Sequence, residues 1–167
     1  MIAINIAVLT VSDTRTEEND SSGRLLQERI VAAGHSVGSY AIVRDDIHIV
    51  RAHLCQSIID ADINAVIING GTGLTGRDGT PEAVRVLLDK EVEGFGELFR
   101  QLSYADIGTS TIASRALAGI ANATFIFCIP GSPGACELAW DKLIAAQLNS
   151  DTRPCNLVQL VPRLREV

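Results

Sequence analysis

Three short runs of mostly apolar residues constrain the fold of this 167-residue chain more than any other feature of its sequence. They cover residues 4–11, 65–69 and 124–129, and β-branched side chains are frequent in all three. Short apolar runs without strict alternation are typical of strands that are buried on both faces of a sheet. We therefore expect these runs to form central strands of a parallel sheet.

Segments with helical spacing separate the predicted strands, and residues 37–43 give a further strand pattern. Apolar residues recur every three or four positions along residues 25–33 and 47–58, and Asp46 is a suitable N-cap for the second segment. Further helices are expected from Pro81 onwards, around residues 95–102, and in an Ala-rich stretch at residues 112–117.

This alternation of strands and helices predicts an α/β fold with three αβα layers, in which a mostly parallel sheet carries helices on both faces. The length and a hydrophobic content of 47% fit a single domain, which we place at residues 1–150. Residues 151–167 show little periodicity, so we expect an extended tail packed on the same domain or on a neighbouring subunit.

A glycine-rich loop links the strand at residues 65–69 to the helix that follows Pro81. Gly70, Gly71 and Gly73 permit positive φ angles and a close approach of backbone N–H groups to a bound oxyanion. Thr80 is a suitable N-cap, and Pro81 suits the first helical position. This layout is typical of an anion-binding site, although a strand-to-helix turn without a ligand has the same glycines.

Polar or glycine-rich residues follow three of the predicted strands. These segments are residues 12–14, 70–78 and 130–134, and the carboxyl ends of parallel strands meet at one edge of the sheet. In the last segment Pro130 and Pro133 lack N–H groups, which leaves Gly131 and Ser132 to present an N–H group and a hydroxyl. We expect a ligand site at this edge, although residues 130–134 alone would also suit an ordinary turn.

Composition and unmatched motifs exclude several classes of function. A net charge of −6 with no basic run disfavours nucleic acid as a partner, and no apolar segment is long enough to span a membrane. The glycine loop matches neither the Walker A nor the dinucleotide-binding pattern, and no Ser-His-Asp triad is evident. The four cysteines include no Cys-x-x-Cys pair, which favours free thiols in a cytoplasmic protein.

Two aspartates, Asp45 and Asp78, follow different strands and could hold Mg²⁺ against nucleotide phosphates. Asp45 would also suit a surface turn, and Asp78 could compensate the dipole of the following helix. Ser114 and Arg115 could contact a phosphate, but a partly buried arginine paired with a carboxylate is an equal alternative. The acidic residues of the loop before Ser22 are expected to form a solvated surface.

Six segments together resemble the molybdenum cofactor biosynthesis family of molybdopterin-binding proteins, and two others are similar to its MoaB branch. The six are residues 70–73, 77–78, 80–83, 93–97, 114–115 and 130–134, and the two are residues 107–111 and 151–156. The resemblance implies the family's α/β fold, a homotrimer or a hexamer built from trimers, and binding of molybdopterin. It also implies use of ATP and Mg²⁺ to adenylylate molybdopterin with release of pyrophosphate, and contact with other enzymes of the pathway.

The two acids of active relatives correspond to Asp45 and Asp78. The resemblance implies that Asp78 holds Mg²⁺ and that Asp45 orients the metal or the nucleophile, although Arg44 replaces a proline common in active relatives. The binding residues it implies are Ser12, Asp13, Gly70, Gly71, Thr72, Gly73, Arg77, Thr80, Glu82, Ser114, Pro130, Gly131, Ser132 and Pro133. Two alternatives are a non-catalytic molybdopterin-binding or scaffold protein and a regulatory module that binds a nucleotide without pterin.

Overall fold

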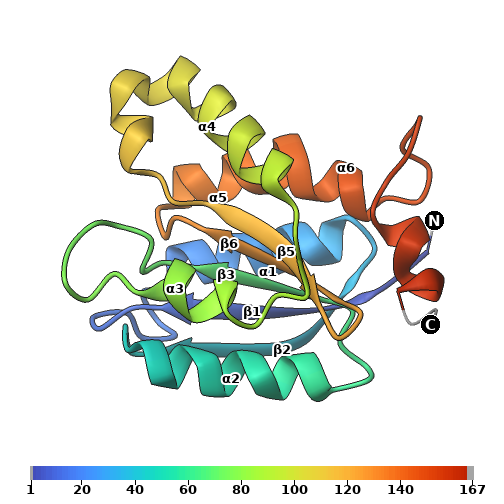
Figure 1. Cartoon of the computed structure of the whole chain (residues 1–167), viewed down its shortest axis with the longest axis horizontal. Helices are drawn as coiled ribbons and strands as arrows, with labels where there is room; N and C mark the ends of the chain where they lie inside the picture. Colours follow the sequence, from blue (N-terminus) through green and yellow to red (C-terminus); the bar gives the residue numbers. More distant parts are fainter. Residues whose placement is uncertain (1, 165–167) are drawn as a thin grey trace.

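A six-stranded sheet lies at the centre of the computed structural model, which describes residues 2–164 (Figure 1). Its strands are β1 (Asn5–Val11), β2 (Ser36–Val43), β3 (Ala65–Asn69), β4 (Lys90–Glu91), β5 (Leu117–Ala121) and β6 (Thr124–Ile129). Their order across the sheet is β2-β1-β3-β6-β5-β4. The first four in that order are parallel, whereas β5 is antiparallel to β6 and β4 is antiparallel to β5. The predicted mostly parallel sheet is confirmed.

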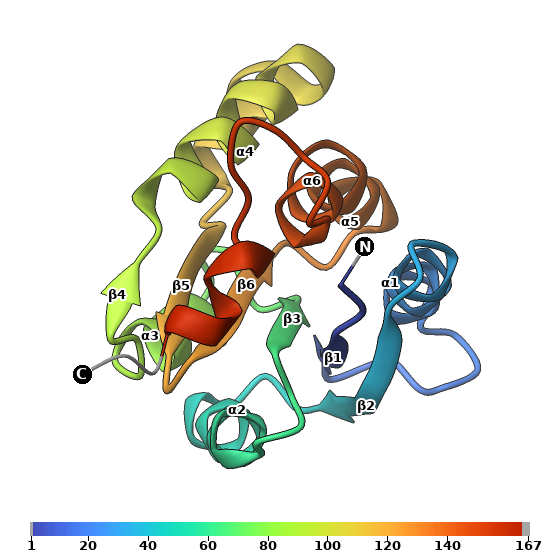
Figure 2. The ribbon, with the colours of Figure 1, turned by 90° about the vertical axis from the view of Figure 1, so that its right-hand side faces the viewer.

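Helices cover both faces of the sheet, as Figure 2 shows with the strands seen nearly end-on. One face carries α2 (Ile47–Ile59) and α3 (Thr80–Arg85). The other face carries α1 (Ser21–Ala32), α4 (Glu93–Ile107), α5 (Pro133–Ala139), the π-helix η2 (Trp140–Ile144) and α6 (Ala145–Leu148). The predicted αβα layering is therefore confirmed. In the described part of the chain, no helix has the length and apolar character needed to cross a membrane.

Each face has its own hydrophobic core. Phe95, Phe99 and Phe127 pack together on the α4 side, where the Phe95 and Phe127 ring centroids lie 5.4 Å apart. On the α2 side, Val50 and Leu54 are fully buried against the sheet. Asp46 caps α2 as predicted, because its carboxylate accepts hydrogen bonds from the backbone N–H groups of the helix's first turn.

The Ala-rich stretch at residues 112–117 does not form the predicted helix. A 3-10 helix, η1 (Gly108–Ala113), covers only its first two residues, and the chain then becomes extended and enters β5. Residues 122–123 join β5 to β6 with positive φ angles, which suit a two-residue hairpin. A Cβ atom on Gly119 would lie 2.6 Å from the carbonyl oxygen of Lys90, so close pairing with β4 needs glycine here. Short apolar runs are ambiguous between helix and strand, and pairing with β6 decides the outcome.

The chain after β6 differs from expectation in two respects. Residues 133–148 form a nearly continuous helical run that the sequence patterns did not indicate, and Ser132 is its N-cap. The tail is not extended, because it contains the 3-10 helix η3 (Val158–Arg163). Val158 is fully buried in the core on the α4 side, so this part of the tail packs on its own domain. Residues 165–167 lie outside the described part of the chain.

Candidate functional site

The polar ends of β1, β3 and β6 meet at one edge of the sheet, as the sequence predicted. These strands are parallel neighbours, so the segments that follow them lie side by side. The Gly70 N–H group donates to the carbonyl oxygen of Ile129 at 3.0 Å. A Cβ atom on Gly131 would lie only 2.9 Å from the Gly70 Cα atom, so the two loops pack backbone against backbone.

The glycine-rich loop has the predicted positive φ angles at two of its three glycines. Gly70 and Gly71 have φ angles of +106° and +63°, which L-residues rarely adopt. Position 73 requires glycine for a steric reason instead, because a Cβ atom there would lie 2.6 Å from Oδ2 of Asp78. The loop therefore requires glycine at three positions for two different reasons.

A buried acid, Asp20, is linked by hydrogen bonds to residues of the strands that end at this edge. It was wrongly predicted to lie on a solvated surface. Its side chain accepts hydrogen bonds from Thr10 Oγ1 at 2.6 Å, from the Tyr40 hydroxyl at 2.7 Å and from the Gly23 N–H group at 3.0 Å. Asn69 Nδ2 donates to the same threonine oxygen at 2.9 Å. The position of Asp20 immediately before a helix start was the signal for an N-cap.

Asp45 lies opposite the start of the glycine loop. Its Oδ1 atom is buried and has no hydrogen-bond partner among the described residues, and the same holds for Thr80 Oγ1. Both atoms lie within about 3 Å of the position that a Cβ atom on Gly71 would take. Thr80 does not cap α3, whose N-cap position is occupied by Gly79, so that prediction was wrong. Burial raises the pKa of the Asp45 carboxyl above its usual range.

Asp13 and Arg77 form an ion pair in the lining of a cleft of about 700 Å³ that includes Asp45. The other lining residues are Arg44, Asp46, Ile47, Ile49, Gly76 and Gly79. The hydrogen bond from Arg77 lowers the pKa of the Asp13 carboxyl. The Asp45 N–H group also donates to Asp13 Oδ1 at 3.3 Å, which ties the ends of β1 and β2 together.

Asp78 is engaged by its own loop. Its Oδ2 atom accepts hydrogen bonds from the Thr75 hydroxyl at 2.6 Å and from the Thr75 N–H group at 2.8 Å. The hydroxyl bond is the main reason that the pKa of Asp78 is lowered, so the carboxylate is ionised at neutral pH. Asp78 thus has a structural contact that the sequence did not reveal, in addition to any contact with a ligand.

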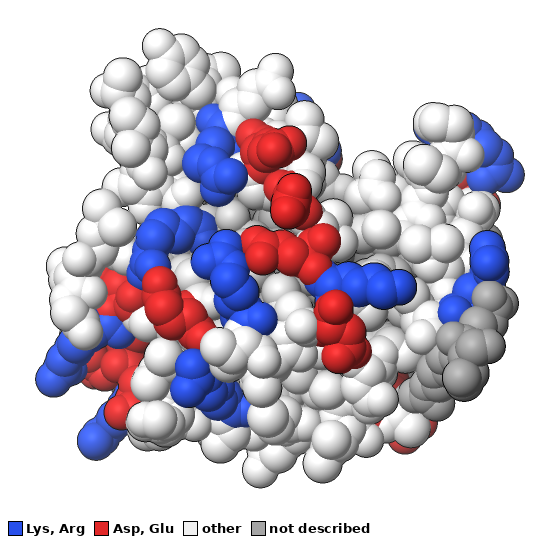
Figure 3. Space-filling view, viewed as in Figure 1, with Lys and Arg blue, Asp and Glu red and all other residues white. Residues whose placement is uncertain are grey.

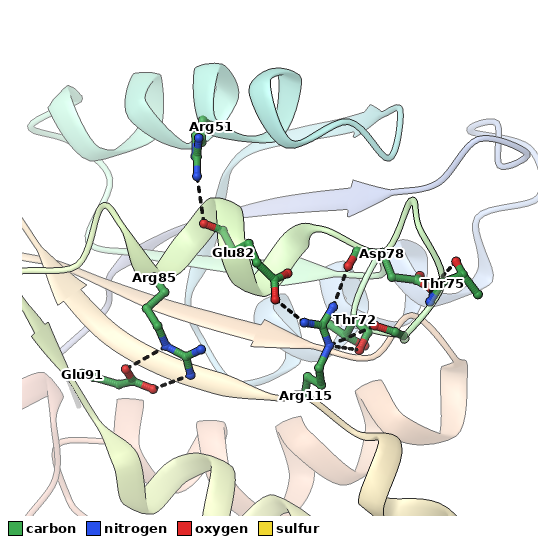
Figure 4. A network of polar contacts seen from close by, with 9 residues as sticks. Arg51, Thr72, Thr75, Asp78, Glu82, Arg85, Glu91 and Arg115 are labelled. Carbon is green, nitrogen blue, oxygen red and sulfur yellow. Dashed lines mark hydrogen bonds and ion pairs between the residues drawn. The ribbon is translucent and has the colours of Figure 1, made fainter.

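Arg115 resolves the alternatives left open by the sequence, because it forms an ion pair with Glu82 (Figure 4). It also donates to backbone carbonyl groups of the glycine loop. Ser114 lies apart from the cleft, in a hollow of about 460 Å³ beside Arg100. Ser132 uses its hydroxyl to accept from the backbone of α5. These two serines are therefore placed less favourably for a ligand than the glycine loop.

The oxygen-rich cleft suits a hard cation such as Mg²⁺ only in combination with ligand oxygens. In the described part of the chain, no three His, Cys, Asp or Glu side chains gather into a complete metal cage. Mg²⁺ commonly binds one or two carboxylates together with substrate phosphates and water. The unpartnered Oδ1 atom of Asp45 fits that mode. On the face seen in Figure 3, basic and acidic side chains are interleaved, without a broad patch of one sign.

The chain is similar in sequence to known proteins. Residues 7–150 match a family model described as a probable molybdopterin binding domain. The chain is 52% identical over 155 residues to molybdenum cofactor biosynthesis protein B of Escherichia coli K12, covering 93% of this chain and 91% of the relative. It is 49% identical over 150 residues to the protein of the same name from Bacillus cereus, covering 89% of each chain.

Solved structures agree with the sequence comparisons. A crystal structure of a molybdenum cofactor biosynthesis protein B superposes with a TM-score of 0.86 at 48% identity, covering 88% of this chain and 92% of the other. The tungsten cofactor synthesizing protein MoaB from Pyrococcus furiosus gives a TM-score of 0.82 at 32% identity, covering 98% of each chain. With the same fold and about half of its residues identical to those relatives, the chain belongs to the molybdenum cofactor biosynthesis protein B (MoaB) family.

Proposed function

We propose that this protein binds molybdopterin and transfers AMP to it from Mg-ATP. An oxygen of the terminal phosphate of molybdopterin attacks the α-phosphorus of ATP, the bond to the β-phosphate oxygen breaks, and pyrophosphate leaves. The observation that carries the proposal is the unpartnered, buried carboxylate oxygen of Asp45 beside the glycine loop at the carboxyl edge of the sheet. Transfer at phosphorus depends mainly on positioning and charge neutralisation, which such a site supplies.

The residues at this edge of the sheet have different roles in the proposed reaction. The glycine loop brings backbone N–H groups to a phosphate, because Gly70 and Gly71 have no side chains in the way. Asp45 orients the metal or the attacking phosphate, and Arg77, which is exposed beside the cleft, is available to a phosphate on exchange of its ion-pair partner Asp13.

The residues present fit Mg²⁺, which Asp45 and Asp78 would hold. When bound, Mg²⁺ neutralises charge that develops on the phosphate oxygens and on the leaving pyrophosphate. The lowered pKa of Asp78 keeps this carboxylate ionised at neutral pH, as a cation ligand requires. The raised pKa of Asp45 makes its metal affinity fall first as the solution is acidified.

The test is AMP transfer from α-labelled ATP to purified molybdopterin, with the parent protein beside its Asp78→Asn and Asp78→Ala variants. Asparagine keeps an acceptor oxygen for Thr75 and removes only the charge, whereas alanine also opens the turn. We expect Asp78→Asn to lower kcat by about 100-fold or more while molybdopterin still binds. A variant with unchanged kcat would remove Asp78 from the chemistry.

A non-catalytic molybdopterin-binding or scaffold role is the second candidate. It is favoured by the engagement of Asp78 Oδ2 with Thr75, which leaves that oxygen committed to the loop. It is also favoured by Arg44 at the position before Asp45. A folded parent protein that binds molybdopterin and forms no adenylylated product in the same assay would establish this role.

We further propose that the protein assembles into a homotrimer or a hexamer built from trimers. Four large apolar side chains are exposed on α4 and η1, which project from the body in Figure 1: Leu98, Tyr104, Ile107 and Ile112. Ile112 is 81% exposed, which is unfavourable for a side chain that remains in water. Light scattering after size-exclusion chromatography measures the assembly mass, and a monomer of 17.8 kDa would refute this proposal.

A further inference from the structure

Arg115 contacts the glycine loop at both of its ends, although it comes from the segment between η1 and β5 (Figure 4). We propose that Arg115 is a positioning residue, which holds the loop of residues 72–79 in the shape that binds a phosphate-bearing ligand. It acts through the backbone of the loop and is not itself a phosphate ligand. The identity of the ligand rests on the proposed function, whereas the effect on the loop does not.

The contacts of the guanidinium group span the loop. Its Nε atom donates to the carbonyl oxygens of Thr72 at 3.2 Å and Gly73 at 2.9 Å. Its Nη2 atom donates to the carbonyl oxygen of Asp78, and its Nη1 atom pairs with the Glu82 carboxylate on α3. One planar group therefore connects the start of the loop, the end of the loop and the following helix.

Packing does little to hold the middle of the loop, residues 74–77, in place. Leu74 is 73% exposed, and the Arg77 side chain is 75% exposed. No described atom outside its immediate neighbours would lie within 4 Å of a Cβ atom on Gly76. Inside the loop, Asp78 and Thr75 close a tight turn. The Thr80 N–H group donates to the carbonyl oxygen of Gly71 at 3.0 Å, and Arg77 pairs with Asp13. Arg115 adds three hydrogen bonds to backbone carbonyl groups at both ends of the loop, so the loop shape depends in large part on this side chain.

The chemistry of the guanidinium group explains why it would act on the loop and not on the ligand. Arginine has five N–H donors and no acceptor, so it binds only the loop's carbonyl oxygens and leaves the N–H groups for an anion. Glu82 offsets its charge, and the donors named above face protein oxygens. A lysine at position 115 would keep the charge, but it could not reproduce the planar fork that reaches both ends of the loop.

The experiment compares amide hydrogen exchange in the parent protein and in the variants Arg115→Gln and Arg115→Lys. The matched control is Arg85→Gln, because Arg85 forms a two-pronged ion pair with Glu91 close by in Figure 4. We expect exchange of the amides at residues 72–79 to rise at least about tenfold in both Arg115 variants, since several hydrogen bonds are lost. The control should leave exchange of the loop unchanged.

Steady-state AMP transfer by the same variants separates positioning from direct contact. We expect Arg115→Gln to lower both kcat/KM and the protection of the loop amides from hydrogen exchange. In Arg115→Ala, millimolar guanidinium should restore part of both quantities. Reduced activity with unchanged loop exchange would mean that Arg115 touches the substrate, and it would overturn the proposal. Unchanged loop exchange in folded variants would overturn it as well. If the parent shows no transfer, exchange alone decides the inference about Arg115.

If Arg115→Gln lowers the protection of the whole sheet, Arg115→Lys and Glu82→Gln decide the matter. Glu82→Gln removes the ion pair and leaves the three carbonyl contacts in place. We expect it to raise exchange of the loop less than Arg115→Lys does. Equal effects of the two would show that the ion pair holds the loop, and they would refute the role of the carbonyl contacts.

Discussion

Gly70→Ala should destabilise the protein severely, although it adds one methyl group to a loop at the edge of the sheet. The φ angle of Gly70 is +106°, outside the left-handed helical region that non-glycine residues sometimes adopt. A Cβ atom at this position would also lie well under 3.0 Å from the carbonyl oxygen of Val11, at the end of β1. That oxygen belongs to the backbone of a central strand, so no side-chain rotation can make room.

The magnitude follows from these two effects. A residue held in a φ range used almost only by glycine costs about 1–3 kcal/mol. Forcing a methyl group into a filled space typically costs about 1–3 kcal/mol more. Together they predict a loss of about 2–6 kcal/mol in the free energy of unfolding, which is a large part of the stability of a typical domain. The strain falls between β1 and the glycine loop, so binding of phosphate ligands should weaken too.

The assay is urea unfolding followed by circular dichroism, with Gly76→Ala as the matched control in the same loop. Gly76 has no described neighbour within 4 Å of the added atom, and its φ lies outside the positive range. We expect the control to stay within about 1 kcal/mol of the parent and to be slightly more stable if it changes at all. A Gly70→Ala protein within about 1 kcal/mol of the parent would refute the reasoning.

Three further predictions concern single side chains. Burial raises the pKa of the Asp45 carboxyl in the folded protein, so the parent should lose stability as pH rises from the pKa of this carboxyl in the unfolded chain to its higher pKa in the folded protein. Asp45→Asn should lack this loss in thermal melts, and equal pH profiles of the two proteins would contradict the prediction. Tyr40→Phe should lower the free energy of unfolding in urea by about 1.5–3 kcal/mol, because the Tyr40 hydroxyl donates to the buried Asp20 carboxylate. A smaller loss would mean that water takes the place of this hydroxyl. Burial raises the pKa of Cys128 and of Cys136 to about 12, so an aromatic disulfide reagent should modify these two thiols only after unfolding.

Much of the fold could be predicted because its main determinants are local in the sequence. The apolar runs of β1, β3 and β6 identified the central strands, and parallel pairing then placed their polar ends at one edge. Gly70 and Gly71 indicated a loop with positive φ angles, which the structure confirms. These features depend on hydrophobic burial and backbone sterics, which a short stretch of sequence already specifies.

Parts of the candidate site could not be predicted, because they depend on partners farther along the chain or on the folded shape of a loop. Asp20 appeared to belong to a polar surface loop, but Thr10 and Tyr40 bring donors that make its burial favourable. Asp78 was expected to face a cation, and only the folded loop shows its hydrogen bonds with Thr75. The position of Asp20 before a helix start indicated an N-cap, but no local pattern indicated the side-chain donors of either acid.

By itself, the sequence determined the α/β class, the central parallel strands, the glycine loop and membership of the family, since each depends on local patterns. Only the tertiary structure decided that residues 117–121 form an antiparallel strand, because their short apolar run is compatible with helix or strand until β6 pairs with it. It also decided that Arg115 binds Glu82 and the loop carbonyl groups. A guanidinium group can bind a phosphate or a carboxylate equally well, so the partner that the fold places beside it determines its role.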